Sequence, residues 1–230
     1  WQPVIEDGKL YGRGGADAQR RRLCQEHDRK TIGDIIRIMP SESGAPFDPL
    51  RHYIAVKHDA GIKLAAITNG IQTEAIFEAY RLWINLGRQE IAKAPELLHN
   101  LLESAGAEPD SYHTPRIAAV ISVPENGIPQ AVIGTIGENH GRTDEILIGP
   151  KNNGRLTVVS TYSGDMDNPE PNTHCPNLFS YECLAENQTE LAKHIFGVSA
   201  AQYQGEDIRV CSVAEVFANG KWNISIINTL

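Results

Sequence analysis

Two charged side chains that could transfer a proton and bind an anion lie close together near the middle of the chain. Arg116 ends a Thr-Pro-Arg triplet and stands directly before an apolar run, residues 117–121, that has the character of a buried strand. Glu108 lies upstream of Thr114 and could share the same rim as a carboxylate acid/base. A loop salt bridge between Glu108 and Arg116 would explain the same residues, and it would add little stability if exposed.

An Asn-Gly turn farther upstream is a second candidate for anion binding. Asn69 and Gly70 stand between an apolar run and a helical pattern whose N-cap we assign to Thr73 and whose end we assign to Gly87. The start of a helix offers backbone N–H groups and the positive end of its dipole to an anion or a developing oxyanion. An ordinary turn followed by a helix cap accounts for the same pattern.

The densest positive stretch is residues 13–22, which includes Arg13, Arg20 and Arg22. Guanidinium groups bind phosphate through paired hydrogen bonds, so this stretch could clamp a phosphate. A solvated charged loop is the alternative, because charge runs are commonly exposed. Only convergence with another candidate site would favour the phosphate clamp.

Metal chemistry has weak support. The segment DGKLYGRGGADAQ resembles the metal-site stretch of M20 metallopeptidases, in which Asp17 would bridge two metal ions. The further Glu, His and Asp ligands that a two-metal site needs do not appear, and the histidines show no metal-binding spacing. A serine-nucleophile motif, G-x-S-x-G, is also absent from the sequence. We therefore expect no metal.

The composition bounds the classes of partner. The chain has 230 residues and a formal net charge of −8, which argues against broad nucleic-acid or anionic-membrane binding but allows a small phosphorylated ligand. No apolar run approaches the ~18 residues that a membrane span needs. The four cysteines form no C-x-x-C pair, so we expect reduced thiols in a cytoplasmic protein.

The elements that must position these residues follow from hydrophobic periodicity and turn signals. Helices are expected from residue 73 to Gly87 and at 94–104 and 186–196, whereas residues 1–30 offer short strand-like pieces at best. Strands are expected at 35–39, 53–56, 64–68, 117–123, 130–136, 145–148, 156–161 and 222–227. Because the strands run in hairpins, the pattern indicates an α+β fold with antiparallel sheets in a single domain, 1–230.

Two segments in this order resemble a known family. The stretch ITNGIQTEAIFEAY (residues 67–80) followed by SYHTPRIAAVI (residues 111–121) is similar to archaeal-type inosine monophosphate (IMP) cyclohydrolases and their bacterial relatives. The segments AVIGTIG, VVSTYSGD and FANGKWNISI also resemble family segments. The likeness extends from about residue 50 to residue 230, well over half of the chain.

The resemblance implies a fold, a reaction and a set of roles. The fold would be a four-layer αββα sandwich like that of N-terminal-nucleophile hydrolases. The reaction would close the purine ring of 5-formamidoimidazole-4-carboxamide ribonucleotide to give IMP and water, without metal or cofactor. The partner would thus be a small purine nucleotide, and a homo-oligomer is allowed. The roles implied are proton transfer for Glu108, substrate contact for Arg116, Asn69, Gly70, Thr73 and Thr114, and phosphate binding for Arg20 or Arg22.

Two departures from the family pattern leave alternatives open. Val56 and Lys57 stand where the family carries a Tyr-Asn pair, so Lys57 is a candidate catalytic cation or the mark of a changed substrate. The first ~30 residues match the family's opening strands poorly, and we expect this region to be atypical or truncated. The alternatives are a relative that forms or hydrolyses amides on another small molecule, and a non-catalytic nucleotide-binding homologue.

Overall fold

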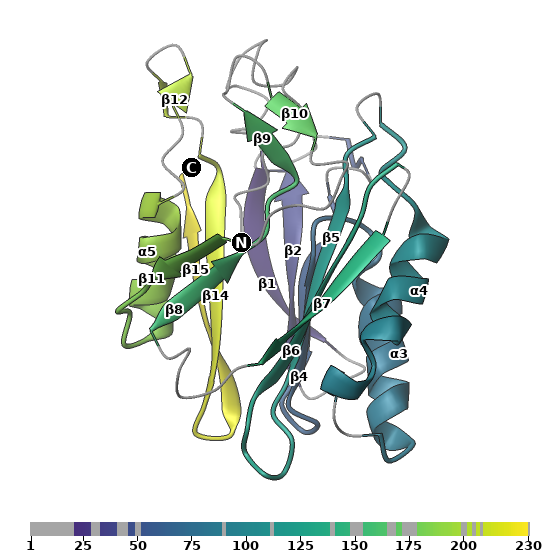
Figure 1. Cartoon of the computed structure of the whole chain (residues 1–230). Helices are drawn as coiled ribbons and strands as arrows, with labels where there is room; N and C mark the ends of the chain where they lie inside the picture. The colour runs from purple at the N-terminus through teal and green to yellow at the C-terminus, as the bar shows by residue number, and fades with distance from the viewer. Residues whose placement is uncertain are drawn as a thin grey trace.

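A computed structural model describes most of the chain. The described residues are 21–28, 33–40, 46–48, 52–88, 91–110, 113–138, 141–147, 154–164, 169–171, 179–198, 202–203, 206–207 and 209–229. Within them the fold is α+β: one large antiparallel sheet, three α-helices and several two-stranded pairs (Figure 1). The α+β class expected from the sequence is confirmed.

Seven strands follow one another in chain order across the large sheet, and every neighbouring pair is antiparallel. They are β1 (Arg21–Asp28), β2 (Gly33–Pro40), β3 (Ile54–Asp59), β4 (Leu64–Thr68), β5 (Arg116–Ser122), β6 (Gln130–Ile136) and β7 (Gly141–Leu147). In such a meander each odd strand begins where its even neighbour ends. The start of β1, the end of β4 and the start of β5 therefore lie at the same end of the strands. We call this end of the sheet the Arg116 edge.

Two helices cover one face of this sheet. They are α3 (Thr73–Asn85) and α4 (Pro95–Ala105), and a short 3-10 helix, η1 (Ile91–Lys93), lies between them in the chain. Their apolar residues recur at spacings of three and four, so one side of each helix packs on the sheet. The core on this face contains Leu64, Ala66, Ile76, Phe77, Tyr80, Ile91, Ala94, Leu98, Leu102, Ala118, Val120, Val132 and Ile136.

A hairpin packs on the opposite face, over strands β1 to β3. It consists of β14 (Cys211–Ala218) and β15 (Lys221–Asn228). The core between hairpin and sheet contains Leu23, Ile36, Ile38, Tyr53, Ala55, Val56, Val210, Cys211 and Val213. Helix α5 (Gln188–Val198) packs on the hairpin in turn, and the Ser212 hydroxyl donates to the carbonyl of Ala192 over 3.1 Å (Figure 1).

The remaining described strands form separate two-stranded pairs. They are β8 (Arg155–Val158) with β11 (Phe179–Glu182), β9 (Tyr162–Gly164) with β10 (Pro169–Pro171), and β12 (Gln202–Tyr203) with β13 (Glu206–Asp207). In the described part of the chain these pairs and the hairpin do not join into one second sheet. The expected four-layer αββα sandwich therefore stays a prediction.

Strand β1 is longer than the sequence indicated, since eight residues pair with β2 where short strand-like pieces were expected. Its sequence, RRLCQEHD, is mostly polar, which suits an edge strand but hides it from a hydrophobicity pattern. The strand is held to the hairpin by the side-chain amide of Asn228. This amide accepts from the Leu23 N–H (2.8 Å) and donates to the Leu23 carbonyl (3.2 Å).

Most predicted elements are confirmed, with shifts at their ends. Strands β4 and β6 have the predicted bounds, and α4 lies one residue later than expected. Helix α5 begins two residues later than predicted, because the Asn187 side chain accepts from the N–H groups of Thr189 and Glu190 (both 3.0 Å) and so caps the helix.

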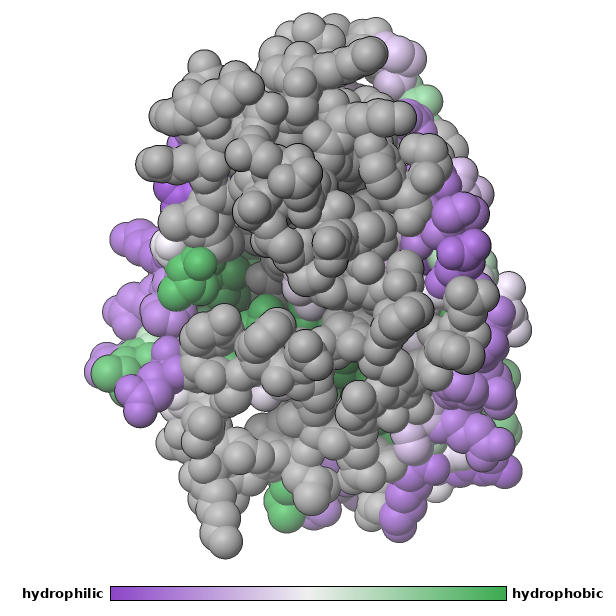
Figure 2. Space-filling view, turned by 45° about the horizontal axis from the view of Figure 1, so that its top comes forward, coloured by the Kyte–Doolittle hydropathy of each residue, from purple (hydrophilic) through white to green (hydrophobic). Residues whose placement is uncertain are grey.

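Figure 2 shows hydrophilic side chains along both flanks of the molecule, including the flank that carries α3 and α4. None of the helices in the described ranges combines the length and the apolarity that crossing a bilayer requires.

Three cysteines within these ranges, Cys24, Cys183 and Cys211, are free thiols.

The packing of α4 on the sheet can be tested at Gly134 of β6. A methyl group there would lie 2.6 Å from Leu102 Cδ1 and 2.9 Å from Leu98 Cδ2, so the two leucines of α4 would have to move. We expect Gly134→Ala to lower the free energy of unfolding by about 1–3 kcal/mol, as overpacking does. Urea unfolding followed by circular dichroism measures this change.

The matched control is the same substitution at Gly197 of helix α5. A methyl group at this position would have no heavy atom within 4 Å. Gly197→Ala should stabilise by up to about 1 kcal/mol, because alanine is the better helix former. Equal effects of the two substitutions would contradict the packing of α4 on β6.

Candidate functional site

Glu108, Arg116 and Gln72 meet at the Arg116 edge, on the face of the sheet that carries the helices. Arg116 is the first residue of β5 and alternates in phase with Ala118 and Val120, which pack under the helices. Glu108 follows the end of α4, and Gln72 directly precedes α3. Three segments that are distant in sequence therefore converge on one guanidinium group.

The Arg116 guanidinium is buried and hydrogen-bonded to both of the other segments. Its Nη1 donates to Glu108 Oε1 (2.5 Å) and Gln72 Oε1 (2.8 Å), and its Nε donates to the Gly106 carbonyl (2.9 Å). The side chains of Arg116 and Glu108 are 6% and 11% exposed. The sequence allowed an exposed salt bridge of little worth, but the structure buries the pair, so removing either partner would leave an uncompensated charge.

The pKa of Glu108 is raised to about 7. Burial is the main cause, because it disfavours the charged carboxylate, and the nearby negative charge of Asp110 acts in the same direction. The charge and hydrogen bond of Arg116 oppose this shift without cancelling it. A carboxyl group that titrates near neutral pH can both release and accept a proton under physiological conditions.

The loop that carries Glu108 is fixed by its own hydrogen bonds. The Asp110 carboxylate accepts from the Thr114 N–H (2.9 Å) and from the Thr114 hydroxyl. The Glu108 N–H donates to the Thr114 carbonyl (2.9 Å). Thr114, expected to bind substrate, is thus engaged within the loop, where it orients Glu108.

Asn69 joins the end of β4 to the start of β5. Its side-chain N–H donates to the Pro115 carbonyl (2.8 Å), and its side-chain oxygen accepts from the Ile117 N–H (2.8 Å). Both bonds flank Arg116 in the chain, so Asn69 determines where β5 begins. The Asn-Gly turn and the Thr-Pro-Arg triplet, two separate sequence signals, are therefore in direct contact.

Gly70 lies against the buried network. A Cβ atom at this position would clash with Glu108 Oε1, and it would lie 2.5 Å from Gln72 Oε1 and 2.8 Å from Arg116 Nη1. A side chain at this position would therefore force the Glu108, Gln72 and Arg116 side chains to move. This is a packing constraint on the site, in addition to the turn that the sequence indicated.

Thr73 does not cap α3 with its side chain, contrary to the sequence prediction. It is the first helical residue, and the N-cap position falls on Gln72. The buried Thr73 hydroxyl lies 2.6 Å from the Thr68 hydroxyl and donates to the Ile54 carbonyl. Because those bonds use the hydroxyl, Thr73 ties α3 to β3 and β4.

Lys57 lies in a different cluster. Its side chain is 1% exposed, and its ammonium group lies 3.2 Å from Glu78, 3.3 Å from Asp28 and 3.6 Å from Glu74. Burial alone would lower the pKa of Lys57, but the Glu78 hydrogen bond and the Asp28 charge raise it above its ordinary value. Among the described residues its recorded partners belong to β1 and α3, away from Glu108, and its catalytic role stays a prediction.

Arg22 lies on β1 at the same edge and on the same face as Arg116. In β1 it alternates in phase with Asp28, whose contact with Lys57 identifies the helix-bearing face. The Arg22 side chain is exposed. Arg20 and Asp17 lie outside the described residues.

Sequence reasoning missed Gln72 and Asp110. Gln72 is buried and accepts a hydrogen bond from Arg116, yet a glutamine in a turn carries no distinctive signal. Asp110 precedes Thr114 by four residues, a spacing typical of a loop closed by a side-chain hydrogen bond, and this signal could have been found. The carbonyl of Gly106 cannot be assigned from sequence.

The first test of the site is Gly70→Ala. The added methyl group would separate the three polar side chains around it, so we expect a loss of about 2 kcal/mol or more in the free energy of unfolding. Urea unfolding measures this loss. The open position Gly197 provides the control for the same substitution, and a Gly70→Ala protein as stable as wild type would contradict the network.

The second test is the pH dependence of stability in Glu108→Gln. A raised pKa means that the folded state holds this proton more tightly, so its contribution to stability is present below pH 4.5 and is lost as the pH rises through about 7. Glutamine resembles the protonated form. The stability of the variant relative to wild type should therefore rise between pH 5 and pH 8, by at most about 3 kcal/mol, on top of a pH-independent cost from the lost Arg116–Glu108 ion pair.

Thermal unfolding of both proteins across this pH range measures the difference. A stability difference that stays constant, or that shifts in favour of wild type at high pH, would show that Glu108 is charged throughout the range.

Comparison with protein families gives a match. The sequence profile of a family described as IMP cyclohydrolase-like protein matches residues 20–221. The matched range includes every site residue discussed above from Arg20 to Arg116. No curated protein matches the chain.

Proposed function

The chain belongs to the IMP cyclohydrolase-like protein family, and we propose that it closes the purine ring of 5-formamidoimidazole-4-carboxamide ribonucleotide to give IMP and water. The observation that carries this proposal is the buried Glu108 carboxyl, which Arg116 holds and whose pKa is about 7. Such a group suits a reaction that must move protons between nitrogen and oxygen at neutral pH.

The reaction places two demands on the site. The carboxamide nitrogen attacks the formyl carbon, so a C–N bond forms and the formyl oxygen becomes a hydroxyl group. The C–O bond then breaks, and the oxygen leaves as water with one proton from the carboxamide nitrogen and one from the formamido nitrogen. An amide nitrogen is a weak nucleophile, so the enzyme must orient it and stabilise charge on the formyl oxygen.

Glu108 would move the protons in this scheme. As a carboxylate it would accept a proton from the attacking nitrogen, and as the acid it would return one to the departing oxygen. Arg116 and Gln72 would hold the carboxyl in place, and the start of α3 beside Gln72 would bring the positive end of the helix dipole to the reacting oxygen. Asn69, Gly70, Thr73 and Thr114 would shape the pocket around the purine.

Arg22, with Arg20, would hold the phosphate. In support, Arg22 shares an edge and a face of the sheet with Arg116, and the two strands are four positions apart. That separation is roughly 19 Å between backbones at the ordinary strand spacing, part of which the arginine side chains would span. In this arrangement the positive charges of Arg20 and Arg22 would face the phosphate group of the ligand, although the chain as a whole is acidic.

The proposed fold is the four-layer αββα sandwich of N-terminal-nucleophile hydrolases. Its support is the order in which α3 and α4, the seven-stranded sheet, the β14–β15 hairpin and α5 pack on one another.

The reaction as written needs neither metal nor organic cofactor. We propose a cytoplasmic enzyme of purine biosynthesis, with a homo-oligomer as the allowed assembly.

The changed-substrate alternative rested on Lys57. Its ammonium group faces Asp28, Glu74 and Glu78, which supports a structural role that ties β1 and β3 to α3. This placement supports a structural role for Lys57, and ring closure is the function that we favour.

The test is an optical assay of IMP formation from the formamido ribonucleotide. Wild type should turn over, and Glu108→Gln should lower kcat by about 100-fold or more, the usual contribution of an acid/base group. Glu103→Gln on the exposed side of α4 is the matched control and should keep the wild-type rate.

Three outcomes would contradict the proposal. If wild type binds IMP without turnover, the protein is a non-catalytic nucleotide-binding homologue. If it neither binds nor turns over these nucleotides, its substrate differs. If Glu108→Gln retains wild-type kcat, the reaction does not depend on the Glu108 carboxyl group.

A further inference from the structure

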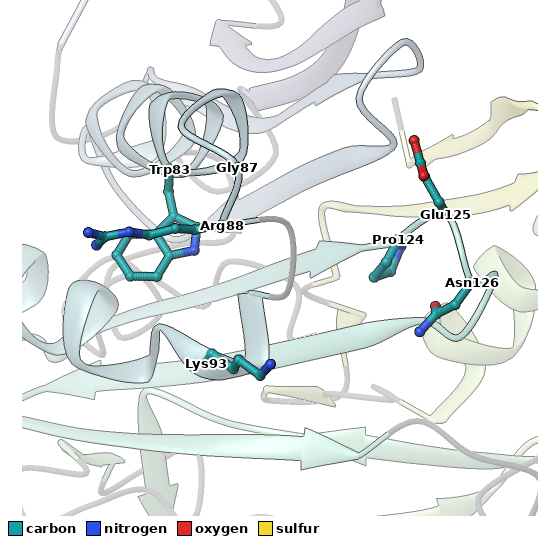
Figure 3. A pocket seen from close by; sticks show the side chains of 7 residues that line it. All are labelled: Trp83, Gly87, Arg88, Lys93, Pro124, Glu125 and Asn126. Carbon is teal, nitrogen blue, oxygen red and sulfur yellow. The ribbon is translucent and has the colours of Figure 1, made fainter.

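A cavity lies at the other end of the sheet from Glu108. Helix α3 runs from the Arg116 edge toward this end, and the turn after β5 approaches it from the other side. The cavity has a volume of about 550 Å³, within the range of small-molecule sites. Figure 3 shows the residues that line it: Trp83, Gly87, Arg88, Lys93, Pro124, Glu125 and Asn126.

The end of α3 fixes one wall of the cavity. Gly87 adopts a left-handed conformation (φ 79°) and donates to the Ile84 carbonyl (2.9 Å), while the Arg88 N–H donates to the Trp83 carbonyl (3.2 Å). This is a Schellman ending, and it confirms Gly87 as the predicted stop of the helix. The turn brings the Arg88 guanidinium over the Trp83 ring, 4.4 Å from its centroid, which holds the indole in place.

The indole nitrogen of Trp83 is the unusual feature of this wall. It is buried, and no hydrogen-bond acceptor is recorded for it in the part of the chain that the structure describes. A buried donor without an acceptor costs about 1–3 kcal/mol, and buried tryptophan N–H groups ordinarily find a partner. The cavity beside Trp83 is the space from which an acceptor could come.

The other lining groups indicate what the acceptor would belong to. Lys93 brings a positive charge to the cavity, and Figure 3 shows Asn126 on the opposite wall. The Asn126 side-chain oxygen accepts from the Ile128 N–H (3.0 Å), and its NH₂ group, for which no acceptor is recorded among the described residues, could donate to a ligand. Glu125 carries the opposite charge, which disfavours polyanions and can accept hydrogen bonds from ligand hydroxyls.

We propose that this cavity binds a small hydroxylated oxyanion, with one carboxylate or phosphate monoester group that accepts from Trp83 Nε1 and Lys93 Nζ. The ligand hydroxyls would bond Asn126 and Glu125. This site is separate from the Glu108–Arg116 network, so its ligand would not be the substrate of the proposed reaction. The inference does not depend on the proposed function.

The experiment follows the indole N–H signals of the ¹⁵N-labelled full chain by NMR, with Trp83→Phe used to assign the Trp83 signal. The probes are ribose 5-phosphate and gluconate, which distinguish a phosphate ligand from a carboxylate ligand, and neutral ribose is the control. At least one oxyanion should shift the Trp83 signal downfield, and ribose should not. Concentrations up to about 10 mM detect a millimolar dissociation constant.

Charge substitutions separate this cavity from any other binding site. Lys93→Gln should weaken binding of the active probe by about tenfold, as expected for loss of a hydrogen bond to a charged group. Lys221→Gln, the same change at the exposed β14–β15 turn, should leave binding within about twofold. Binding at the Glu108 site would be insensitive to Lys93.

Two results would overturn the proposal. In the first, the Trp83 signal is unmoved by both oxyanions at these concentrations. In the second, the signal shifts equally in wild type and in Lys93→Gln, so that the ligand does not use this cavity's charge.

Discussion

Burial of the Arg116 guanidinium is the constraint on which the site depends. A buried guanidinium must be supplied with acceptors, and here they come from Gly106 and Glu108 after α4 and from Gln72 before α3. The same group therefore fixes the end of α4, the start of α3 and the first residue of β5 relative to one another. Because the site is assembled around a charge, its geometry is more sensitive to polar substitutions than to changes in the apolar core.

The network also explains why one carboxyl can be both structural and chemically active. Arg116 holds Glu108 in position, but burial has the larger effect and raises its pKa to about 7. Asp110 strengthens this shift and at the same time fixes the loop through Thr114. The residues that orient the carboxyl are thus partly the residues that tune its proton affinity.

The sequence predicted the regular elements well and the contacts between them less well. Apolar periodicity located α3, α4 and the strands β4 and β6, since their patterns follow directly from burial on a sheet. It missed the length of β1, because a polar edge strand is stabilised by backbone pairing and by Asn228, which lies 205 positions away. At the site, charge and turn signals pointed to Arg116, Glu108 and Asn69, whereas Gln72 became visible only once α3 was placed against β5. The separate carboxylate environment of Lys57 depends on tertiary packing in the same way.

The bond between Leu23 and Asn228 has a consequence for how the chain reaches its native state. The Leu23 N–H and carbonyl on the first strand of the sheet gain this partner only when the last strand of the hairpin supplies its amide. During synthesis, this bond would therefore form only after nearly all of the described chain is made. Contacts of such long sequence separation form slowly, because the entropy of closing a large loop must be lost first. The final step of folding would then be the docking of the hairpin, and the nascent protein would be most prone to self-association just before it.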